Sequence, residues 1–272
     1  TKHIERINSP ERVGASLRRA FSSMRMGKPG PAMLEIPADI AEMEVHGSVV
    51  DSYVPVKTAI SGADENDVME AAKALLDAKR PLILAGQGVL YAEASAELTE
   101  LAELLQIAVS TSMAGKSAFS ETHPLSVGSV SEVMNGAGLD YMRESDVLFG
   151  IGTSFTIQGM VTPYPSGKIM IHATNDPIDL HKDYIADHPL LGDARIVLRQ
   201  MIDACKELLS TRQRKTQDTA DRISALRSAW YGEWESKLTS SESPITPYRV
   251  LGEFMSRVDP SDAIVTHDSG SP

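Results

Sequence analysis

A glycine-rich turn, Gly86-Gln87-Gly88, directly follows the apolar run from Pro81 to Ala85. Where such a turn joins a strand to a helix, backbone N–H groups can approach a phosphate, and the helix N-terminus adds a favourable field. The dinucleotide fingerprint needs a third glycine three residues further on, where this chain has Tyr91. This departure disfavours an NAD-dependent dehydrogenase. The turn therefore predicts either a phosphate-contacting site or a tight turn that requires small residues.

A second short motif, Gly115-Lys116-Ser117, is similar to the end of a phosphate-binding loop. The nucleotide-hydrolase motif requires another glycine five residues before Gly115, and Ser110 stands there. We therefore reject the nucleotide-hydrolase interpretation. Lys116 is expected either to meet a ligand phosphate as a point charge or to be solvated.

Covalent and metal chemistry find little support in the sequence. Cys205 falls within a predicted helix and has no histidine nearby in sequence, and no serine lies in a Gly-x-Ser-x-Gly elbow. Acidic and histidine side chains gather in one segment, but none of their spacings matches a known ligand pair, so a solvated loop is expected. These side chains are Asp176, Asp179, His181, Asp183, Asp187 and His188.

Composition excludes several classes of partner. The 272 residues include 26 Lys and Arg against 37 Asp and Glu, a net charge of −11, which disfavours nucleic acid as a partner. The longest apolar runs fall far short of the roughly 20 residues of a membrane-spanning helix, so no membrane is expected. A single cysteine cannot form an internal disulfide, and no secretory signal precedes Ile4. We expect a cytoplasmic protein.

The middle of the chain alternates apolar strands with amphipathic helices. Strands that are apolar throughout indicate a parallel sheet covered on both faces. The fold class is therefore α/β, a Rossmann-like parallel sheet forming a central domain over residues 64–208 with helices on both faces. The predicted strands are 81–85, 107–111, 147–151 and 169–173, and the predicted helices are 68–78, 92–105, 131–142 and 194–209.

Partial α/β domains are expected to flank this central domain. Residues 1–45 predict a helix that begins at Pro10 and a strand over 32–36, and 46–63 form a linker. Residues 209–244 form a connecting helix, and 245–272 predict a helix and then a strand over 262–267. The connecting helix has an apolar stripe, expected to pack on the body of the protein, made of Ile223, Leu226, Trp230 and Trp234.

Taken in order, several segments resemble thiamine-diphosphate-dependent enzymes of the acetolactate synthase and 2-oxoacid decarboxylase type. Residues 27–39 (GKPGPAMLEIPAD) are similar to the signature that closes their pyrimidine-binding domain, and 80–88 (RPLILAGQG) to the opening of their central domain. Residues 264–270 (IVTHDSG) look like the first strand and turn of their diphosphate-binding domain. The segments between follow in the family's order: 112–119, 123–125, Gly128, 150–152 and 175–177.

The resemblance implies the chemistry of thiamine diphosphate, whose thiazolium carbanion attacks a 2-oxo acid so that carbon dioxide leaves. It also implies an activating glutamate and a Gly-Asp-Gly magnesium motif, and neither is in this chain. We therefore assign no catalytic residue and no metal ligand. The sequence starts at Thr1 and stops soon after a predicted strand, so we expect an internal segment that is inactive alone.

The resemblance carries over binding positions only. The turn after the last strand would lie beside the cofactor diphosphate, and acetolactate synthases also bind FAD in a groove of the central domain. Their Arg-Phe-Asp-Asp-Arg segment is replaced here by residues 153–157 (TSFTI), and Thr174 stands where they often have aspartate, so an empty groove remains an alternative to FAD. The diphosphate candidates are Asp268, Ser269, Gly270 and Ser271, and the groove candidates are Gly86, Gly88, Ser112, Gly115, Lys116, Gly128, Gly152 and Asp176.

Partners follow from the same resemblance. Family active sites form between subunits, so the parent is expected to be a homodimer or homotetramer that acts on a small 2-oxo acid. Around Met33, Leu34, Ile264 and Val265 we expect apolar surface that makes the isolated chain self-associate. The alternative to an enzyme segment is a non-catalytic module that binds a nucleotide, FAD or ADP.

Overall fold

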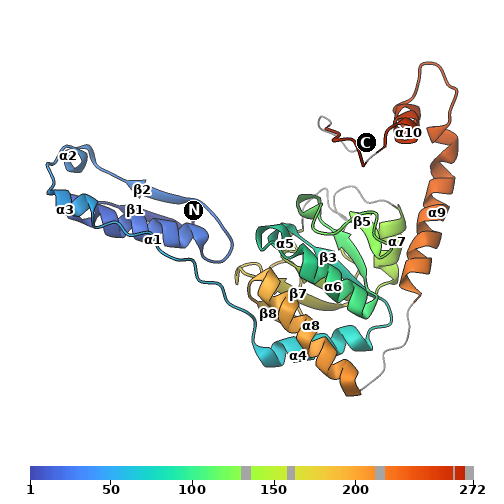
Figure 1. Ribbon diagram of the computed structural model, residues 1–272, viewed down its shortest axis with the longest axis horizontal. Coiled ribbons are helices and arrows are strands. Elements are labelled where there is room, and N and C mark those ends of the chain that lie inside the picture. The colour runs from blue at the N-terminus through green and yellow to red at the C-terminus, as the bar shows by residue number, and fades with distance from the viewer. Residues whose placement is uncertain (130–135, 158–162, 212–217, 260, 267–272) are drawn as a thin grey trace.

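The computed structural model describes residues 1–129, 136–157, 163–211, 218–259 and 261–266. A small N-terminal unit lies to one side of a larger α/β domain, to which a linker without regular structure joins it (Figure 1). Two further helices, α9 (Thr219–Leu238) and α10 (Pro247–Arg257), follow the α/β domain. The α/β domain holds the parallel sheet that the sequence predicts.

The N-terminal unit is one helix packed on a two-stranded sheet. Strand β1 (His3–Arg6) pairs in parallel with β2 (Ala32–Glu35), and α1 (Val13–Arg25) covers one face after a 3-10 turn at Pro10–Arg12. The helix and the second strand were predicted, whereas β1 was missed because Ile4 is the one apolar residue among its four. Two four-residue helices follow, α2 (Ala38–Ala41) and α3 (Gly47–Val50), the latter inside the predicted linker.

Six parallel strands form the central sheet in the order β5-β4-β3-β6-β7-β8. The chain enters at β3, proceeds outward through β4 and β5, and crosses back to β6 on the other side of β3. In doubly wound sheets ligands bind where the strand order reverses, here at the carboxyl ends of β3 and β6. The strands are β3 (Pro81–Ala85), β4 (Ala108–Thr111), β5 (Ser126–Ser129), β6 (Val147–Ile151), β7 (Ile169–Thr174) and β8 (His188–Leu191).

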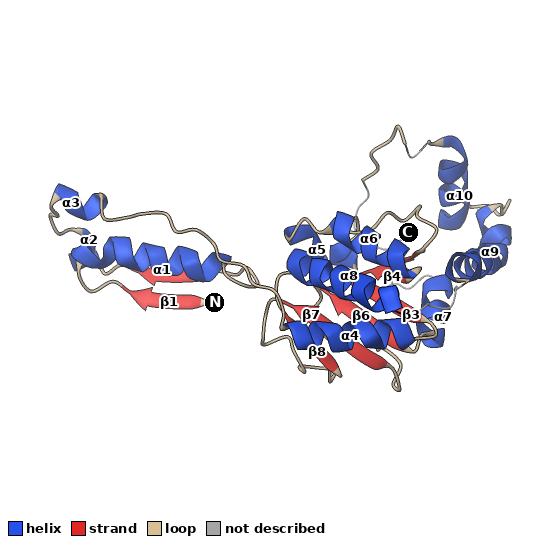
Figure 2. Ribbon diagram, turned by 60° about the horizontal axis from the view of Figure 1, so that its bottom comes forward, coloured by secondary structure: helices blue, strands red, loops and turns tan. Residues whose placement is uncertain are grey.

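Helices cover both faces of the sheet, as predicted. Alternate residues of β3 point to opposite faces, so Ile83 joins the core beneath one helical layer and Leu84 the core beneath the other. One layer contains α4 (Glu65–Asp77), α5 (Gln87–Tyr91), α6 (Ser95–Leu105) and α8 (Ala194–Thr211), and the other α7 (Gly136–Glu144) and the start of α9 (Figure 2).

Local sequence explains where these helices begin. The side chain of Asp64 caps α4 by accepting the backbone N–H of Asn66 at 2.9 Å, and apolar residues then recur at intervals of three and four.

The predicted stripe of α9 packs as expected in its first half, where Ile223 and Leu226 are buried in the core. Trp230 is partly buried against the same core, whereas the Trp234 ring lies 5.2 Å from Tyr248 of α10.

One predicted strand does not form. Of residues 262–267, the structure describes 262–266, and these have no strand geometry and no ladder partner among the described residues. Ile264 is 98% exposed. A strand needs a neighbour for its backbone N–H and C=O groups, and an apolar run alone does not supply one.

Candidate functional site

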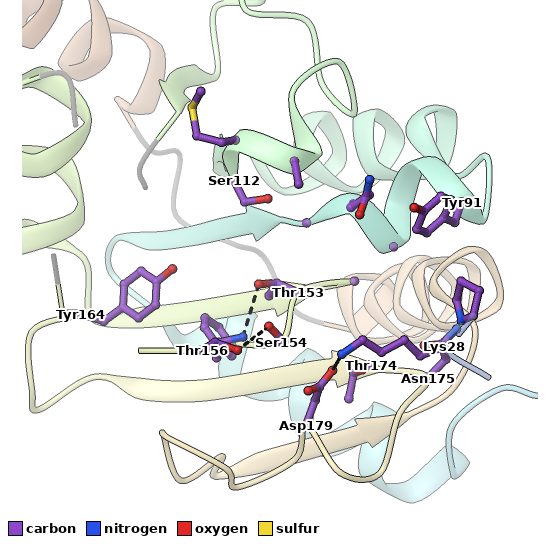
Figure 3. A pocket seen from close by; sticks show the side chains of 18 residues that line it. Lys28, Tyr91, Ser112, Thr153, Ser154, Thr156, Tyr164, Thr174, Asn175 and Asp179 are labelled. Atoms are coloured by element: carbon purple, nitrogen blue, oxygen red, sulfur yellow. Dashed lines mark hydrogen bonds and ion pairs between the residues drawn. The ribbon is translucent and has the colours of Figure 1, made fainter. Parts of the chain in front are cut away.

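A cavity of about 470 Å³ opens at the carboxyl ends of the central strands. Its walls come from the turn after β3, the 3-10 turn η2 (Met113–Gly115), and the loops after β6 and β7 (Figure 3). The volume lies within the range of about 300–1,000 Å³ usual for small-molecule sites. Polar lining residues are Lys28, Gln87, Tyr91, Ser112, Thr153, Ser154, Thr156, Tyr164, Thr174, Asn175 and Asp179.

The floor of the cavity is a close contact between two glycine turns. Gly86 donates its N–H to Ile151 O at 2.9 Å, and Gly88 donates to Gly152 O at 2.9 Å. Gly152 has φ +63°, and a Cβ on Gly88 would come within 2.7 Å of Gly152 Cα. Small residues are therefore required here by the packing of the two turns, and the N–H groups of Gly86 and Gly88 are already used within the fold.

The loop after β6 forms the second wall and is held from below by β7. The Nε2 atom of His172, on β7, donates to the Thr153 carbonyl oxygen at 2.9 Å. The ring of Phe155, a non-glycine residue at φ +47°, packs edge-on against the His172 ring at 4.8 Å. Burial lowers the pKa of His172, so the neutral imidazole is favoured in the folded protein.

Tyr164 lines the cavity beside Phe155. The Tyr164 and Phe155 rings lie 5.4 Å apart, and the Tyr164 backbone N–H donates to the Tyr184 hydroxyl at 3.1 Å. Burial raises the pKa of Tyr164, with a smaller contribution from Tyr184. Tyr164 is therefore a neutral phenol at physiological pH.

Charged groups meet at the outer end of the cavity. Lys28 Nζ lies 2.8 Å from Asp179 Oδ2 and 3.8 Å from Asp176 Oδ2. A second cation, Lys182, lies 3.2 Å from Asp179 Oδ1 and donates to Thr156 Oγ1 at 2.8 Å. Lys28 reaches the site from the N-terminal unit, so two parts of the chain build this cavity (Figure 3).

The structure brings some of the predicted groove residues together. Gly86, Gly88, Ser112 and Gly152 line the cavity. Gly115 is buried behind it, where a Cβ would approach Ala85 O at 2.6 Å.

Other predicted groove residues lie off the cavity wall. Lys116 points to Glu121, with Nζ 3.6 Å from Oε1, and Gly128 on β5 accepts the Ser110 hydroxyl. Asp176 stands at the rim near Lys28. The four predicted diphosphate positions, Asp268, Ser269, Gly270 and Ser271, lie outside the described residues.

Several lining residues were not singled out from the sequence, notably Lys28, Tyr91 and Asn175 as contributors to this groove. Thr153, Ser154 and Thr156 come soon after β6, Thr174 is the last residue of β7, and Asn175 follows it. Polar residues immediately after apolar parallel strands are the signal that could have found them, because all those ends meet at one edge. Lys28 carries no comparable signal, since its place depends on how the two units pack.

The acidic segment is organised as a loop. Asp183 accepts the N–H of Ile157 at 2.8 Å, and Asp187 accepts the N–H of Met170 at 2.8 Å. Among the described residues, no group of three or more His, Cys, Asp or Glu side chains could hold a metal ion. Asp183 thus holds backbone next to Thr156 of the cavity, whereas Asp187 holds the start of β7, at the other end of that strand.

Residues 68–201 match the family model of the thiamine pyrophosphate enzyme central domain. The chain carries the central domain of a thiamine pyrophosphate enzyme. Among curated proteins it is 30% identical to a probable acetolactate synthase large subunit of Methanococcus aeolicus, over 99% of this chain and 47% of that protein. It is also 30% identical to the glyoxylate carboligase of Escherichia coli O157:H7, over 71% of this chain and 33% of that protein.

Solved structures agree on the fold. The crystal structure of benzoylformate decarboxylase from Polynucleobacter necessarius matches with a TM-score of 0.66 at 24% identity, over 80% of this chain and 40% of that chain. At this identity the likeness shows the fold alone. The chain spans about half the length, 47% and 46%, of the two acetolactate synthase relatives that it matches over 99% of its residues.

Within the described part, no helix is both long and apolar enough to cross a bilayer.

Proposed function

We propose that this chain is a segment of a thiamine-diphosphate-dependent lyase or carboligase that acts on a 2-oxo acid. The observation that carries the proposal is the match to acetolactate synthase large subunits across 99% of the chain, beyond the central domain itself. On this proposal the N-terminal unit ends a pyrimidine-binding domain, and residues 245–272 begin a diphosphate-binding domain. The named enzymes among the relatives favour this proposal over a non-catalytic nucleotide-binding module.

Thiamine diphosphate, when bound, supplies a nucleophilic carbon that adds to the 2-oxo acid and accepts electrons as carbon dioxide leaves. The described part of the chain offers no carboxylate cluster for the Mg²⁺ that would bridge the diphosphate. These residues do not fit the cofactor by themselves, so we assign them no catalytic step and propose that the 272 residues alone are inactive.

The cavity is the place where FAD or ADP would bind, as the family resemblance implies. Its features fit a flavin dinucleotide poorly. Two of the glycine N–H groups are engaged with β6, and Lys28 is already paired with Asp179. An arginine that pairs with a phosphate would contribute a charge-assisted hydrogen bond of about 1.5–3 kcal/mol, and no arginine is among the described residues that line this cavity. We propose that the groove holds either no dinucleotide or one bound weakly.

Two measurements test the proposal. The full-length parent, supplied with thiamine diphosphate and Mg²⁺, is expected to release carbon dioxide from pyruvate or a related 2-oxo acid, whereas the 272 residues alone release none. Failure of the parent to bind thiamine diphosphate in calorimetry would contradict the assignment. A yellow colour and flavin absorbance in the purified parent would contradict the empty groove, while leaving the enzyme class in place.

The parent is further proposed to be a cytoplasmic homodimer or homotetramer. Support comes from the family, in which active sites form between subunits, and from the single buried Cys205, which is compatible with a reducing compartment. Sedimentation velocity of the parent tests the oligomeric state, and a monomer at micromolar concentration would contradict it.

A further inference from the structure

One wall of the cavity belongs to a different unit from the rest. Lys28 and Pro29, from the loop between α1 and β2, line the cavity together with residues that follow β3, β6 and β7. Pro29 also lines a second cavity, of about 550 Å³, between the end of α1, the linker and the start of α8. The loop thus lies between two cavities.

Ion pairs connect the loop between α1 and β2 to the α/β domain. Among residues 1–57, all of which are described, Lys28 is the one whose side chain pairs with a side chain of the α/β domain. The other attachment is the linker, whose end is fixed by Asp193 N–H donating to Ser61 O at 2.8 Å and by the Gln200 amide on Ala63. The N-terminal unit is therefore attached at two places. The linker is fixed by hydrogen bonds, and the loop that carries Lys28 is held by ion pairs.

Asp179, the partner of Lys28, has a second cation beside it. The Asp179 side chain is only 6% exposed, and a buried carboxylate without a cation is strongly destabilising. Lys182, three residues along the same loop, lies 3.2 Å from its other oxygen. When Lys28 leaves, Asp179 still has a cation, and Lys28, which is half exposed, is readily solvated.

We propose that the Lys28–Asp179 ion pair is a latch that closes the cavity with the N-terminal unit, and that Lys182 compensates Asp179 whenever the latch opens. Opening removes the wall formed by residues 28–29 and widens the entrance between the two units. The proposal concerns the movement of this wall and stands whether or not the parent is a thiamine diphosphate enzyme. It gives the two lysines opposite roles, because Lys28 closes the cavity while Lys182 stabilises the open state.

The distance between the units can be measured by single-molecule energy transfer in the 272-residue chain. Dyes are placed on Glu44→Cys in the N-terminal unit and Asp203→Cys on α8, both exposed positions, while buried Cys205 does not compete for label. In this labelled background Lys28→Met is expected to raise the ratio of open to closed molecules about two- to fivefold, the range for partly exposed ion pairs. Lys182→Met is expected to lower that ratio, because opening then leaves Asp179 unpaired.

Two controls accompany the distance measurement. Lys73→Met removes a lysine that pairs with Glu70 within α4, and it should leave the ratio unchanged. Raising the salt concentration from about 0.05 to 1 M in the unsubstituted labelled chain should open the latch without any change at Lys28, because salt screens exposed charges. The proposal is overturned if Lys28→Met leaves the distance distribution as it was, or if both lysine substitutions shift it in the same direction.

Discussion

The backbone N–H of Gly88 donates a 2.9 Å hydrogen bond to the carbonyl oxygen of Gly152, and so ties the turn after β3 to the turn after β6. These strands are neighbours in the sheet although more than sixty residues separate them in the chain. The bond lies where the strand order reverses, directly beneath the cavity. Glycines that a sequence motif links to phosphate binding serve here to bring two backbones together.

Gly88→Ala is expected to destabilise the protein by about 1–3 kcal/mol, the usual cost of forcing extra atoms into a packed site. The added Cβ would lie 2.7 Å from Gly152 Cα and 2.9 Å from Gly152 O, which are backbone atoms that cannot rotate away. Gly232→Ala is the matched control, because no atom lies within 4 Å of its new Cβ in α9. That control should be more stable than the unsubstituted chain by about 0.5–1 kcal/mol. Urea unfolding measures both, and equal midpoints would contradict the role of Gly88.

Glu144 is expected to hold α9 on the α/β domain. Its carboxylate pairs with Arg80, just before β3, and with Arg222 of α9, and the hydrogen bond from Arg222 is the main reason that its pKa is lowered. Glu144→Gln should cost about 1 kcal/mol, since the pairs are partly exposed. Both tryptophans of the chain, Trp230 and Trp234, lie on α9, so a red-shifted emission would report its release.

The control for this prediction is Glu70→Gln, which breaks an ion pair within α4 and should leave tryptophan emission unchanged. If Glu144→Gln lowers stability but leaves the emission unchanged, the network stabilises the domain without holding α9.

Self-association is expected for the isolated chain through the uncovered face of its N-terminal sheet. Ile4 and Met33 are cross-strand neighbours on β1 and β2, exposed by 67% and 55%. Leu34, which the sequence placed in the same exposed patch, is half-buried and lies on the other face. Light scattering of the Ile4→Lys/Met33→Lys double variant should show a dissociation constant at least about tenfold higher.

A matched control for the double variant is Ile185→Lys, on the loop before β8, which is 78% exposed. It should leave association unchanged. A chain that remains monomeric at all concentrations before any substitution would refute the prediction.

The central sheet could be predicted because its interior strands are apolar throughout. The runs 81–85 and 147–151 are wholly buried as β3 and β6, and a short run that is apolar throughout is typical of a strand covered on both faces. The edge strands β5 and β8 were missed, since Ser126–Ser129 and His188–Leu191 contain serine, glycine, histidine and proline. Edge strands are half-exposed, so their sequences need not be apolar.

The candidate site was only partly predictable for a related reason. The family resemblance placed Gly86, Gly88 and Gly152 at the groove, and the structure shows that they line the cavity where two backbones touch and larger residues would not fit. Lys28 was missed because its position in the cavity depends on the contact between two units. Phe155 lies in the segment 153–157, which drew notice only because it lacks the arginines and aspartates of the family. The positive φ of Phe155 follows from its packing on Gly150 and His172, and local sequence does not encode that packing.

The stability of the folded chain is expected to fall as the pH decreases below about 6.5, with a contribution from His172. Burial is the main cause of the lowered pKa of this histidine in the folded state, whereas in the unfolded chain it titrates near 6.5. Between the two pKa values the unfolded chain binds more protons than the folded one, so acid favours unfolding. The stabilisation is fully present above pH 6.5 and is lost as the pH falls through the folded-state pKa.

His172→Gln isolates this contribution, because the glutamine amide can still donate to the Thr153 carbonyl oxygen but carries no titrating group. Its free energy of unfolding in urea should change less between pH 7.5 and 5.5 than that of the unsubstituted chain. His46→Gln, at an exposed position before α3, should keep the full pH dependence. If His172→Gln and the unsubstituted chain lose the same free energy over this interval, the imidazole is not protonated on unfolding and the loop after β6 is held independently of pH.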